Sequence, residues 1–237
     1  MAEAPELSVV IPAFNEEGRL PETLRKLEPY LTRRSDSFEV ILVDDGSRDR
    51  TLRVMHDESE RHPYVKVVAL PANRGKGRAL ASGVAVSTGR FVLISDADLS
   101  TPIEELPKLE AALADGAEVA IASRAKKGAR IEISQPPHRV LMGKIFNLIV
   151  QALLLPGIWD TQCGFKLFKG DLGRHLFGQL KTDGFGYDVE VLYRARRARH
   201  PIAEVPVRWQ HSAPTRVATF RSSLDMLKDV IRIRLGL

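Results

Sequence analysis

Residues 91–101 read FVLISDADLST, an apolar run that ends in two aspartates. The run FVLIS is continuous rather than alternating, which is typical of a strand covered on both faces. Comparable runs stand at 7–12, 38–43, 65–70 and 118–122. Stretches with helical spacing separate these runs, at roughly 20–33, 50–61, 76–87 and 103–114. Strand–helix alternation of this kind predicts an α/β fold with a mostly parallel sheet, flanking helices and right-handed crossovers.

The carboxyl ends of the expected strands carry clusters of polar residues. Ligands of parallel α/β sheets bind at that edge, because the loops that leave the strands converge there. The clusters are Asn15-Glu16-Glu17, Asp44-Asp45-Gly46-Ser47, Asn73-Arg74-Gly75-Lys76-Gly77 and Asp96-Ala97-Asp98. The sequence therefore predicts a single ligand site assembled from these separate segments.

Asp96 and Asp98 form the sharpest of these clusters, since two carboxylates follow directly on a buried strand. Hard oxygen donors suit Mg²⁺ or Mn²⁺, which bind few protein ligands and retain waters and diphosphate oxygens. A D-x-D pattern also occurs in solvated loops, but its place after a parallel strand favours a metal site.

Two other clusters predict contacts with a nucleotide. One residue of the Asp44-Asp45 doublet is expected to bind a ribose or base, and the other to cap the next helix, a role that also suits Ser47. The backbone N–H groups of residues 73–77, together with Lys76, form a candidate diphosphate site; the alternative is a glycine-rich turn with solvated cations. Neither a P-loop nor a dinucleotide-binding G-x-G-x-x-G is present, which argues against an ATPase or a nicotinamide dehydrogenase.

Composition narrows the class of protein further. The chain has 237 residues, of which 44% are hydrophobic and 27% charged, as in an ordinary globular protein. Cys163 is the single cysteine, which excludes a disulfide framework and a multi-cysteine zinc site and fits a reducing compartment. The first residues, MAEAPELSVV, lack a basic region and a long apolar run, so we expect no secretory signal and a cytoplasmic location.

Charge divides the chain into two unlike halves. Residues 1–125 hold 16 Lys/Arg and 21 Asp/Glu, whereas residues 126–237 hold 19 Lys/Arg and 9 Asp/Glu. Nucleic acid, an anionic membrane surface and a phosphate-bearing substrate are all candidate partners of the basic half. Residues 126–137 are polar and predict a mobile loop.

Two amphipathic helices are expected in the basic half, at 139–155 and 220–237. The first is apolar apart from one narrow face, is too short for a secure membrane span and is interrupted by Lys144. It fits either an interfacial helix lying in a bilayer surface or a buried core or dimer helix. The second pairs Leu and Ile side chains with Lys and Arg, as an interfacial helix or an ordinary surface helix would. No transmembrane segment is predicted.

The sequence as a whole resembles family 2 glycosyltransferases of GT-A fold. The matching segments are VVIPAFNEE (9–17), ILVDDGSRDRT (41–51), NRGKGRALASGV (73–84), FVLISDADLST (91–101) and ASR (122–124). Three later segments resemble the polyprenyl-phosphate group of that family and its dolichyl-phosphate β-glucosyltransferase branch: DTQCGFKLF (160–168), GFGYDVEVLY (184–193) and EVPVRW (204–209). The resemblance implies a single GT-A domain over 1–237, in which 1–125 binds a nucleotide sugar and 126–237 binds the acceptor and faces a membrane.

The resemblance also implies residue roles. The nucleoside would be held by Pro12, Phe14, Glu16 and Asp44, and the ribose, diphosphate and metal by Asp96 and Asp98. Arg124 would face the phosphates and acceptor, and Lys166 matches the cation of a second motif. Arg216 corresponds only loosely to a basic residue of the family. Ser100 departs from the larger metal-contacting side chain of several mannosyl members, and the N-terminal anchor of eukaryotic glucosyl members is not found.

This resemblance implies an inverting, metal-dependent transfer of a hexose, with UDP-glucose as donor and a polyprenyl or dolichyl phosphate as acceptor. An ionised acceptor phosphate can attack the sugar with little help from a base, so that Asp188 would orient or assist. With a saccharide acceptor, Asp188 would be the expected base. Asp188 has a structural alternative, since it and Glu190 could simply pair with the arginines that follow.

Other functions remain as alternatives at this point. One is a family 2 enzyme that uses GDP-mannose or a saccharide acceptor. Another is a non-catalytic nucleotide- or nucleic-acid-binding module, which the basic half favours. The basic residues are not interleaved with aromatic ones, and no recognition motif is present, so we expect no nucleic-acid partner.

Overall fold

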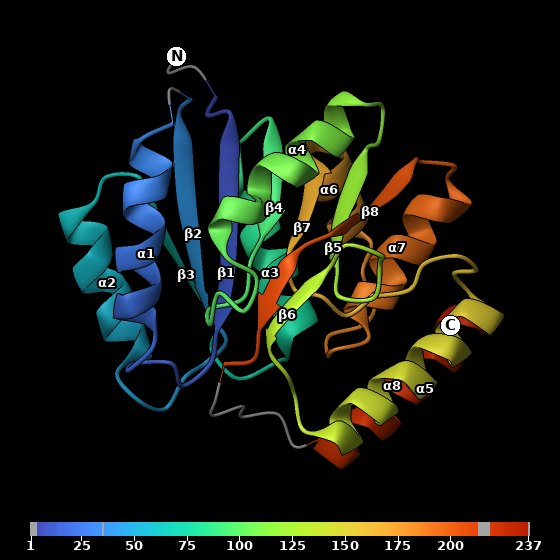
Figure 1. The fold of residues 1–237 in the computed structure, drawn as a ribbon. Coiled ribbons are helices and arrows are strands. Elements are labelled where there is room, and N and C mark those ends of the chain that lie inside the picture. Colours follow the sequence, from blue (N-terminus) through green and yellow to red (C-terminus); the bar gives the residue numbers. More distant parts are fainter. Residues whose placement is uncertain (1–3, 35, 213–218, 237) are drawn as a thin grey trace.

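A seven-stranded sheet in the order β3-β2-β1-β4-β7-β5-β8 forms the centre of the molecule (Figure 1). The computed structural model describes residues 4–34, 36–212 and 219–236, and the side chains of 219–223 are not described. The strands are β1 (Leu7–Ala13), β2 (Phe38–Asp44), β3 (Val65–Ala69), β4 (Phe91–Ile94), β5 (Val119–Ser123), β7 (Lys166–Lys169) and β8 (Ile202–Pro206). All neighbours pair in parallel except β7, which is antiparallel to both β4 and β5.

Helices cover both faces of the sheet. They are α1 (Leu20–Thr32), α2 (Thr51–Arg61), α3 (Lys76–Val86), α4 (Leu106–Ala114), α5 (Pro137–Leu153), α6 (Gly170–Gly178), α7 (Tyr187–Arg197) and α8 (Thr219–Leu235), with a 3₁₀ turn at Ile103–Glu105. One apolar core joins α1, α2 and α4 to one face, and a second joins α3, α6 and α7 to the other. The predicted strands and helices of the first half are thereby confirmed, apart from the 3₁₀ start of 103–114.

Helix α1 shows how the sequence produces this packing. Leu20, Leu24, Leu27 and Leu31 recur at helical spacing, and all of them are buried in the first core. The opposite face of the helix carries charged residues, so that only one orientation against the sheet buries apolar surface.

The prediction of a mobile loop over residues 126–137 is wrong for the middle of that segment. Residues Arg130–Ile133 form strand β6, which pairs in parallel with β9 (Arg208–Gln210) in a separate two-stranded sheet. The side chains of β6 are exposed, so the segment lacks the apolar pattern of a core strand. Its order comes from main-chain hydrogen bonds to a distant part of the chain, which local sequence does not reveal.

Helices α5 and α8 lie side by side at the edge of the molecule, below the ends of the strands in Figure 1. Val150 is the only described residue of α5 that is buried, so the interpretation of α5 as a buried core helix is wrong for the isolated chain. The exposed surface of the pair includes large apolar side chains: Leu141, Ile145 and Leu148 on α5, and Leu224, Ile231 and Leu235 on α8. Within the described residues, no helix combines the length and apolar character needed to cross a membrane.

Candidate active site

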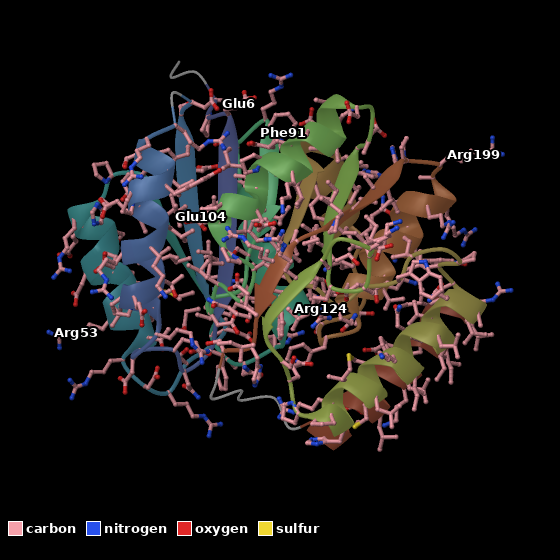
Figure 2. All side chains as sticks on the ribbon, viewed as in Figure 1. Glu6, Arg53, Phe91, Glu104, Arg124 and Arg199 are labelled. Atoms are coloured by element: carbon pink, nitrogen blue, oxygen red, sulfur yellow. The ribbon has the colours of Figure 1, made fainter. Side chains whose placement is uncertain are left out.

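A cavity of about 480 Å³ opens at the carboxyl ends of the parallel strands, where the sequence predicted a ligand site. It gathers most of the predicted site residues: Pro12, Phe14, Glu16, Lys76, Asp96, Asp98, Arg124 and Asp188. Figure 2 shows Arg124 near the ends of β5 and β6, on the side of the sheet that faces the α5–α8 pair. Asp44 and Lys166 do not line the cavity, and Arg216 lies outside the described residues.

The two aspartates at the end of β2, Asp44 and Asp45, have different environments: Asp44 stabilises a turn, and Asp45 faces the cavity. Asp44 is buried, and its carboxylate accepts the backbone N–H of Ser47 at 3.2 Å. Asp45 lines the cavity and accepts hydrogen bonds from Asn73 Nδ2 at 2.9 Å and from the backbone N–H groups of Arg74 at 2.8 Å and Gly75 at 2.9 Å. Those two N–H groups were expected to face a diphosphate, so Asp45 takes the donors that the sequence assigned to a ligand.

The D-x-D segment presents two carboxylates to the cavity. Lys76 Nζ donates to Asp96 Oδ1 at 2.5 Å, and Asp98 Oδ1 accepts the N–H of Ser100 at 2.9 Å. Burial raises the pKa of Asp98, and the neighbouring charge of Asp96 raises it further. A cation between these carboxylates would relieve that repulsion, so the residues fit Mg²⁺ or Mn²⁺.

The remaining ligands of such a cation have to come largely from elsewhere. Among the residues that the structure describes, no group of three or more His, Cys, Asp or Glu side chains is placed to hold a metal. Mg²⁺ commonly binds through one or two carboxylates together with waters and substrate phosphates. Asp96 and Asp98 therefore match a metal that arrives with a diphosphate.

Asp188 meets the cavity with its carboxylate already ion-paired. Lys166 is fully buried behind it, and its ammonium donates to Asp188 and, at 2.6 Å, to the carbonyl oxygen of Cys163. Burial raises the pKa of Asp188 above its ordinary value, while Lys166 and Lys76 lower it. Lys166 thus supports the wall of the cavity.

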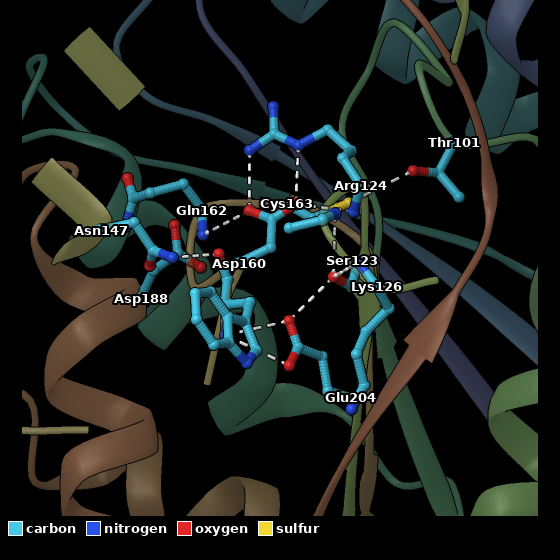
Figure 3. A network of polar contacts seen from close by, with 12 residues as sticks. Thr101, Ser123, Arg124, Lys126, Asn147, Asp160, Gln162, Cys163, Asp188 and Glu204 are labelled. Atoms are coloured by element: carbon cyan, nitrogen blue, oxygen red, sulfur yellow. Dashed lines mark hydrogen bonds and ion pairs between the residues drawn. The ribbon is translucent and has the colours of Figure 1, made fainter. Parts of the chain in front are cut away.

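Arg124 is held by a residue that the sequence did not single out. Asp160 accepts from Arg124 Nε at 2.7 Å and from Nη2 at 2.8 Å (Figure 3). The guanidinium carbon lies 5.3 Å from the centre of the Trp209 ring. Asp160 stands within DTQCGFKLF and Trp209 within EVPVRW, so both were quoted as motif residues, but nothing local identifies their common partner.

Asp45 and His211 also line the cavity. The residues alone left open which member of the Asp44-Asp45 doublet binds a ligand, the resemblance named Asp44, and no motif pointed to His211. The ring of His211 stacks 6.2 Å from that of Trp209, at the end of β9. Both reach the cavity because strands distant in sequence end at the same edge.

A mostly parallel sheet with paired carboxylates and a fixed arginine at its carboxyl edge agrees with the expected glycosyltransferase of GT-A type. Residues 8–177 match the sequence profile of Glycosyl transferase family 2, and the chain belongs to that family. The predicted fold class and the prediction of a glycosyltransferase are therefore confirmed.

Named relatives are similar over nearly the whole chain. The chain is 37% identical to the human dolichyl-phosphate beta-glucosyltransferase over 243 residues, which cover 97% of this chain and 75% of the relative. The enzyme of the same name from Dictyostelium discoideum is 35% identical, with 96% and 73% covered, and that from Saccharomyces cerevisiae is 33% identical, with 97% and 74% covered.

Solved structures agree in fold at lower identity. Glucosyl-3-phosphoglycerate synthase from Mycobacterium tuberculosis, in complex with Mn²⁺, UDP-glucose and phosphoglyceric acid, superposes with a TM-score of 0.74 at 21% identity. The match covers 98% of this chain and 80% of that one. At this identity the likeness carries the fold alone.

Proposed function

We propose that this protein transfers glucose from UDP-glucose to a polyprenyl phosphate of the dolichyl type, with inversion at the sugar. The observation that carries the proposal is that one cavity joins the carboxylates of Asp96 and Asp98 to the guanidinium of Arg124. One part of the cavity thus suits a metal-bound diphosphate, and the other suits a phosphate acceptor.

The comparisons support the choice of substrates. The relatives from human, Dictyostelium and yeast are named dolichyl-phosphate beta-glucosyltransferases. A structural neighbour was crystallised with Mn²⁺ and UDP-glucose. The names of the relatives favour a glucose donor over GDP-mannose, and the ligands of the neighbour are compatible with UDP-glucose.

Asp96 and Asp98 would hold Mg²⁺ or Mn²⁺ in the proposed reaction. A divalent metal there would act as a Lewis acid that stabilises charge on the departing diphosphate. Lys76, 2.5 Å from Asp96, fixes that carboxylate and adds positive charge at the same place.

The acceptor needs orientation more than it needs a base. A phosphate monoester has a second pKa of about 6 and is largely ionised at neutral pH, so its oxygen can attack the sugar directly. Direct displacement on an α-linked donor yields a β-linked product. Asp188 is ion-paired with buried Lys166, and removal of a proton by Asp188 would disturb that pair. This arrangement favours a phosphate over a saccharide hydroxyl as acceptor.

Peripheral attachment to a membrane belongs to the same proposal, because the tail of such an acceptor stays in a bilayer. Helix α5 presents Leu141, Ile145 and Leu148 to solvent and contains Arg139 and Lys144 but no acidic residue. Apolar side chains flanked by cations suit a helix that lies in the interface of an anionic bilayer.

The test is an assay with labelled UDP-glucose, Mn²⁺ and a polyprenyl phosphate in detergent, followed by extraction of the lipid product. Parallel reactions contain GDP-mannose as donor, or a soluble sugar or phosphoglyceric acid as acceptor. We expect label in the lipid fraction only with UDP-glucose and the polyprenyl phosphate, and a β-configured product by NMR. Transfer to a soluble acceptor in preference to the lipid, or a preference for GDP-mannose, would show the proposal to be wrong.

A matched pair of variants ties the activity to the cavity. Arg124→Lys retains the charge but cannot reproduce the forked contact, so the activity should fall at least tenfold. Arg53 is exposed on α2, away from the cavity, and Arg53→Lys should leave the activity unchanged.

A further inference from the structure

Asp160 holds one edge of the Arg124 guanidinium. Its Oδ2 accepts from Nε at 2.7 Å and from the backbone N–H of Arg124 at 2.8 Å, and its Oδ1 accepts from Nη2 at 2.8 Å. Asp160 is buried and does not line the cavity, whereas Arg124 does. Asp160 therefore reaches the cavity through the lining residues that it contacts, and three of its hydrogen bonds go to Arg124.

The pairing keeps both groups charged. Burial opposes ionisation of Asp160, but the Arg124 guanidinium holds the pKa of Asp160 below its ordinary value. The backbone N–H of Gln162 adds a further hydrogen bond to Oδ1, at 3.3 Å. Asp160 is thus an anchored carboxylate rather than a mobile surface charge.

The contacts leave a defined part of the guanidinium for a ligand. A guanidinium has five N–H donors, and Asp160 uses the Nε–H and one Nη2–H. The third nitrogen points away from Asp160 in Figure 3. The guanidinium carbon lies over the Trp209 ring, 5.3 Å from the ring centre. Asp160 therefore fixes one edge of the guanidinium, Trp209 lies beside the group, and the edge formed by Nη1 and Nη2 remains as a fork.

We propose that Asp160 and Trp209 are positioning residues that direct the Nη1–Nη2 edge of Arg124 toward the phosphate monoester of the acceptor. The inference rests on the proposed function, because it takes the acceptor phosphate as the ligand of Arg124. Paired N–H donors match two phosphate oxygens, and this geometry is lost when the guanidinium can rotate. Asp160 neutralises the charge of Arg124, so recognition depends on direction more than on net charge.

The first test separates acceptor binding from donor binding. Asp160→Asn keeps the size of the side chain but removes its charge and places an amide N–H near donors of Arg124. We expect KM for the polyprenyl phosphate to rise at least tenfold, with KM for UDP-glucose changed less than threefold. Glu204→Gln is the matched control: Glu204 is a nearby carboxylate that accepts from Ser123 Oγ at 2.8 Å rather than from Arg124.

A double variant tests whether Asp160 works through Arg124. If it does, Asp160→Asn combined with Arg124→Lys should have the same acceptor KM as Arg124→Lys alone, within about twofold, because coupled residues are not additive. A tenfold further loss in the double variant would overturn the inference, as would an unchanged acceptor KM in folded Asp160→Asn.

Trp209 gives a readout that does not require turnover. The sequence contains two tryptophans, so Trp159→Phe leaves Trp209 as the sole tryptophan, whose emission can be excited selectively. Titration with polyprenyl phosphate in detergent should change its emission, and Asp160→Asn should move the midpoint at least tenfold higher. If Asp160→Asn does not fold, two variants of Trp209 provide the test. Trp209→Phe keeps an aromatic ring beside Arg124 and should leave the acceptor KM unchanged, whereas Trp209→Leu removes the ring and should raise it. Failure of the wild type to glucosylate the lipid would count against the proposed function, whereas unshifted midpoints and KM values in an active enzyme would count against the positioning role alone.

Discussion

The ionised carboxylate of Asp98 destabilises the folded protein but is needed for the proposed binding of a metal. Its burial and the nearby Asp96 raise its pKa, so the folded state holds the ionised carboxylate at a cost in stability. When folding raises the pKa of a carboxyl group, the free energy of unfolding decreases as the pH rises from the unfolded-state pKa to the folded-state pKa of that group. The same repulsion makes the pair ready to bind a cation.

We predict that Asp98→Asn nearly abolishes transfer while the protein stays folded. Without metal at neutral pH, the variant should melt at or above the temperature of the wild type, since it lacks the repelled charge. Mn²⁺ at ten times its Kd would stabilise the wild type by about 1.4 kcal/mol, or roughly 3–6 °C for a chain of this size. The variant should show no such shift.

Calorimetric melts with and without Mn²⁺ measure this difference, with Asp57→Asn on the exposed face of α2 as control. Near-normal turnover of Asp98→Asn in saturating Mn²⁺ would contradict the metal assignment.

Lys166 is a buried cation that stabilises the fold by pairing with Asp188. We predict that Lys166→Met lowers the free energy of unfolding by about 3–5 kcal/mol, because it removes the ion-pair partner of the buried Asp188 carboxylate. Adding Asp188→Asn should recover part of the loss. Lys169→Met is the control: it lies on the same strand, and its ion pair with Glu118 is partly exposed, so it should change stability by less than about 1 kcal/mol. Urea titrations give the comparison, and equal losses in the two single variants would refute the explanation.

At the scale of elements, the loop before β7 supports the end of β4. An added Cβ at Gly164 would stand 2.0 Å from Asp96 Oδ2, so glycine is required for the carboxylate to lie where it does. The antiparallel strand β7 begins just after this loop and hydrogen-bonds to β4. This part of the second half of the chain thus shapes the D-x-D site of the first.

We predict that Gly164→Ala lowers kcat/KM by about 100-fold, because a displacement of the order of 1 Å in a positioning group has that effect. Gly178→Ala, at the end of α6, is the control, since a Cβ there would have no atom within 4 Å. Steady-state kinetics with thermal melts distinguish a displaced carboxylate from a misfolded chain. A fully active Gly164→Ala would mean that Asp96 can move without consequence.

At the scale of the whole molecule, the α5–α8 pair lies below the ends of the strands in Figure 1 and exposes apolar side chains to solvent. We predict that the protein co-sediments with vesicles that contain anionic lipid, and that binding weakens at high salt. Each cation near the surface contributes about 1 kcal/mol, and the Debye length falls from about 10 Å at 0.1 M to about 3 Å at 1 M salt. Insertion of leucine side chains should leave a salt-resistant part.

The variant Leu141→Asp with Leu148→Asp should reduce vesicle binding at least tenfold, since burial of each leucine is worth about 1.5–3 kcal/mol. Val86→Asp, at an exposed apolar position on α3, should bind like the wild type. Absence of binding at low salt would make the pair a contact surface for another protein and would weaken the proposal of a lipid acceptor.

The α/β class, the first five strands and the edge at which the site forms could all be predicted from the sequence. Those features are local: a continuous apolar run, a leucine every turn of α1 and the polar residues that follow each strand are all readable within a short window. The resemblance carried by segments such as VVIPAFNEE and FVLISDADLST led to the family. The polar residues after the strands placed Lys76, Asp96 and Asp98 at the cavity, and the resemblance added Arg124.

The neighbours that those residues contact could not be predicted in this way and follow from the three-dimensional fold. It turned Asp45 rather than Asp44 toward the cavity, buried Lys166 behind Asp188, and joined Arg124 to Asp160 and Trp209. It also inserted β7 between β4 and β5 and paired β6 with β9, against the expectation of a loop. These outcomes depend on contacts between segments far apart in the chain. Packing and hydrogen-bond satisfaction over the whole molecule select such contacts, so no short stretch of sequence contains them.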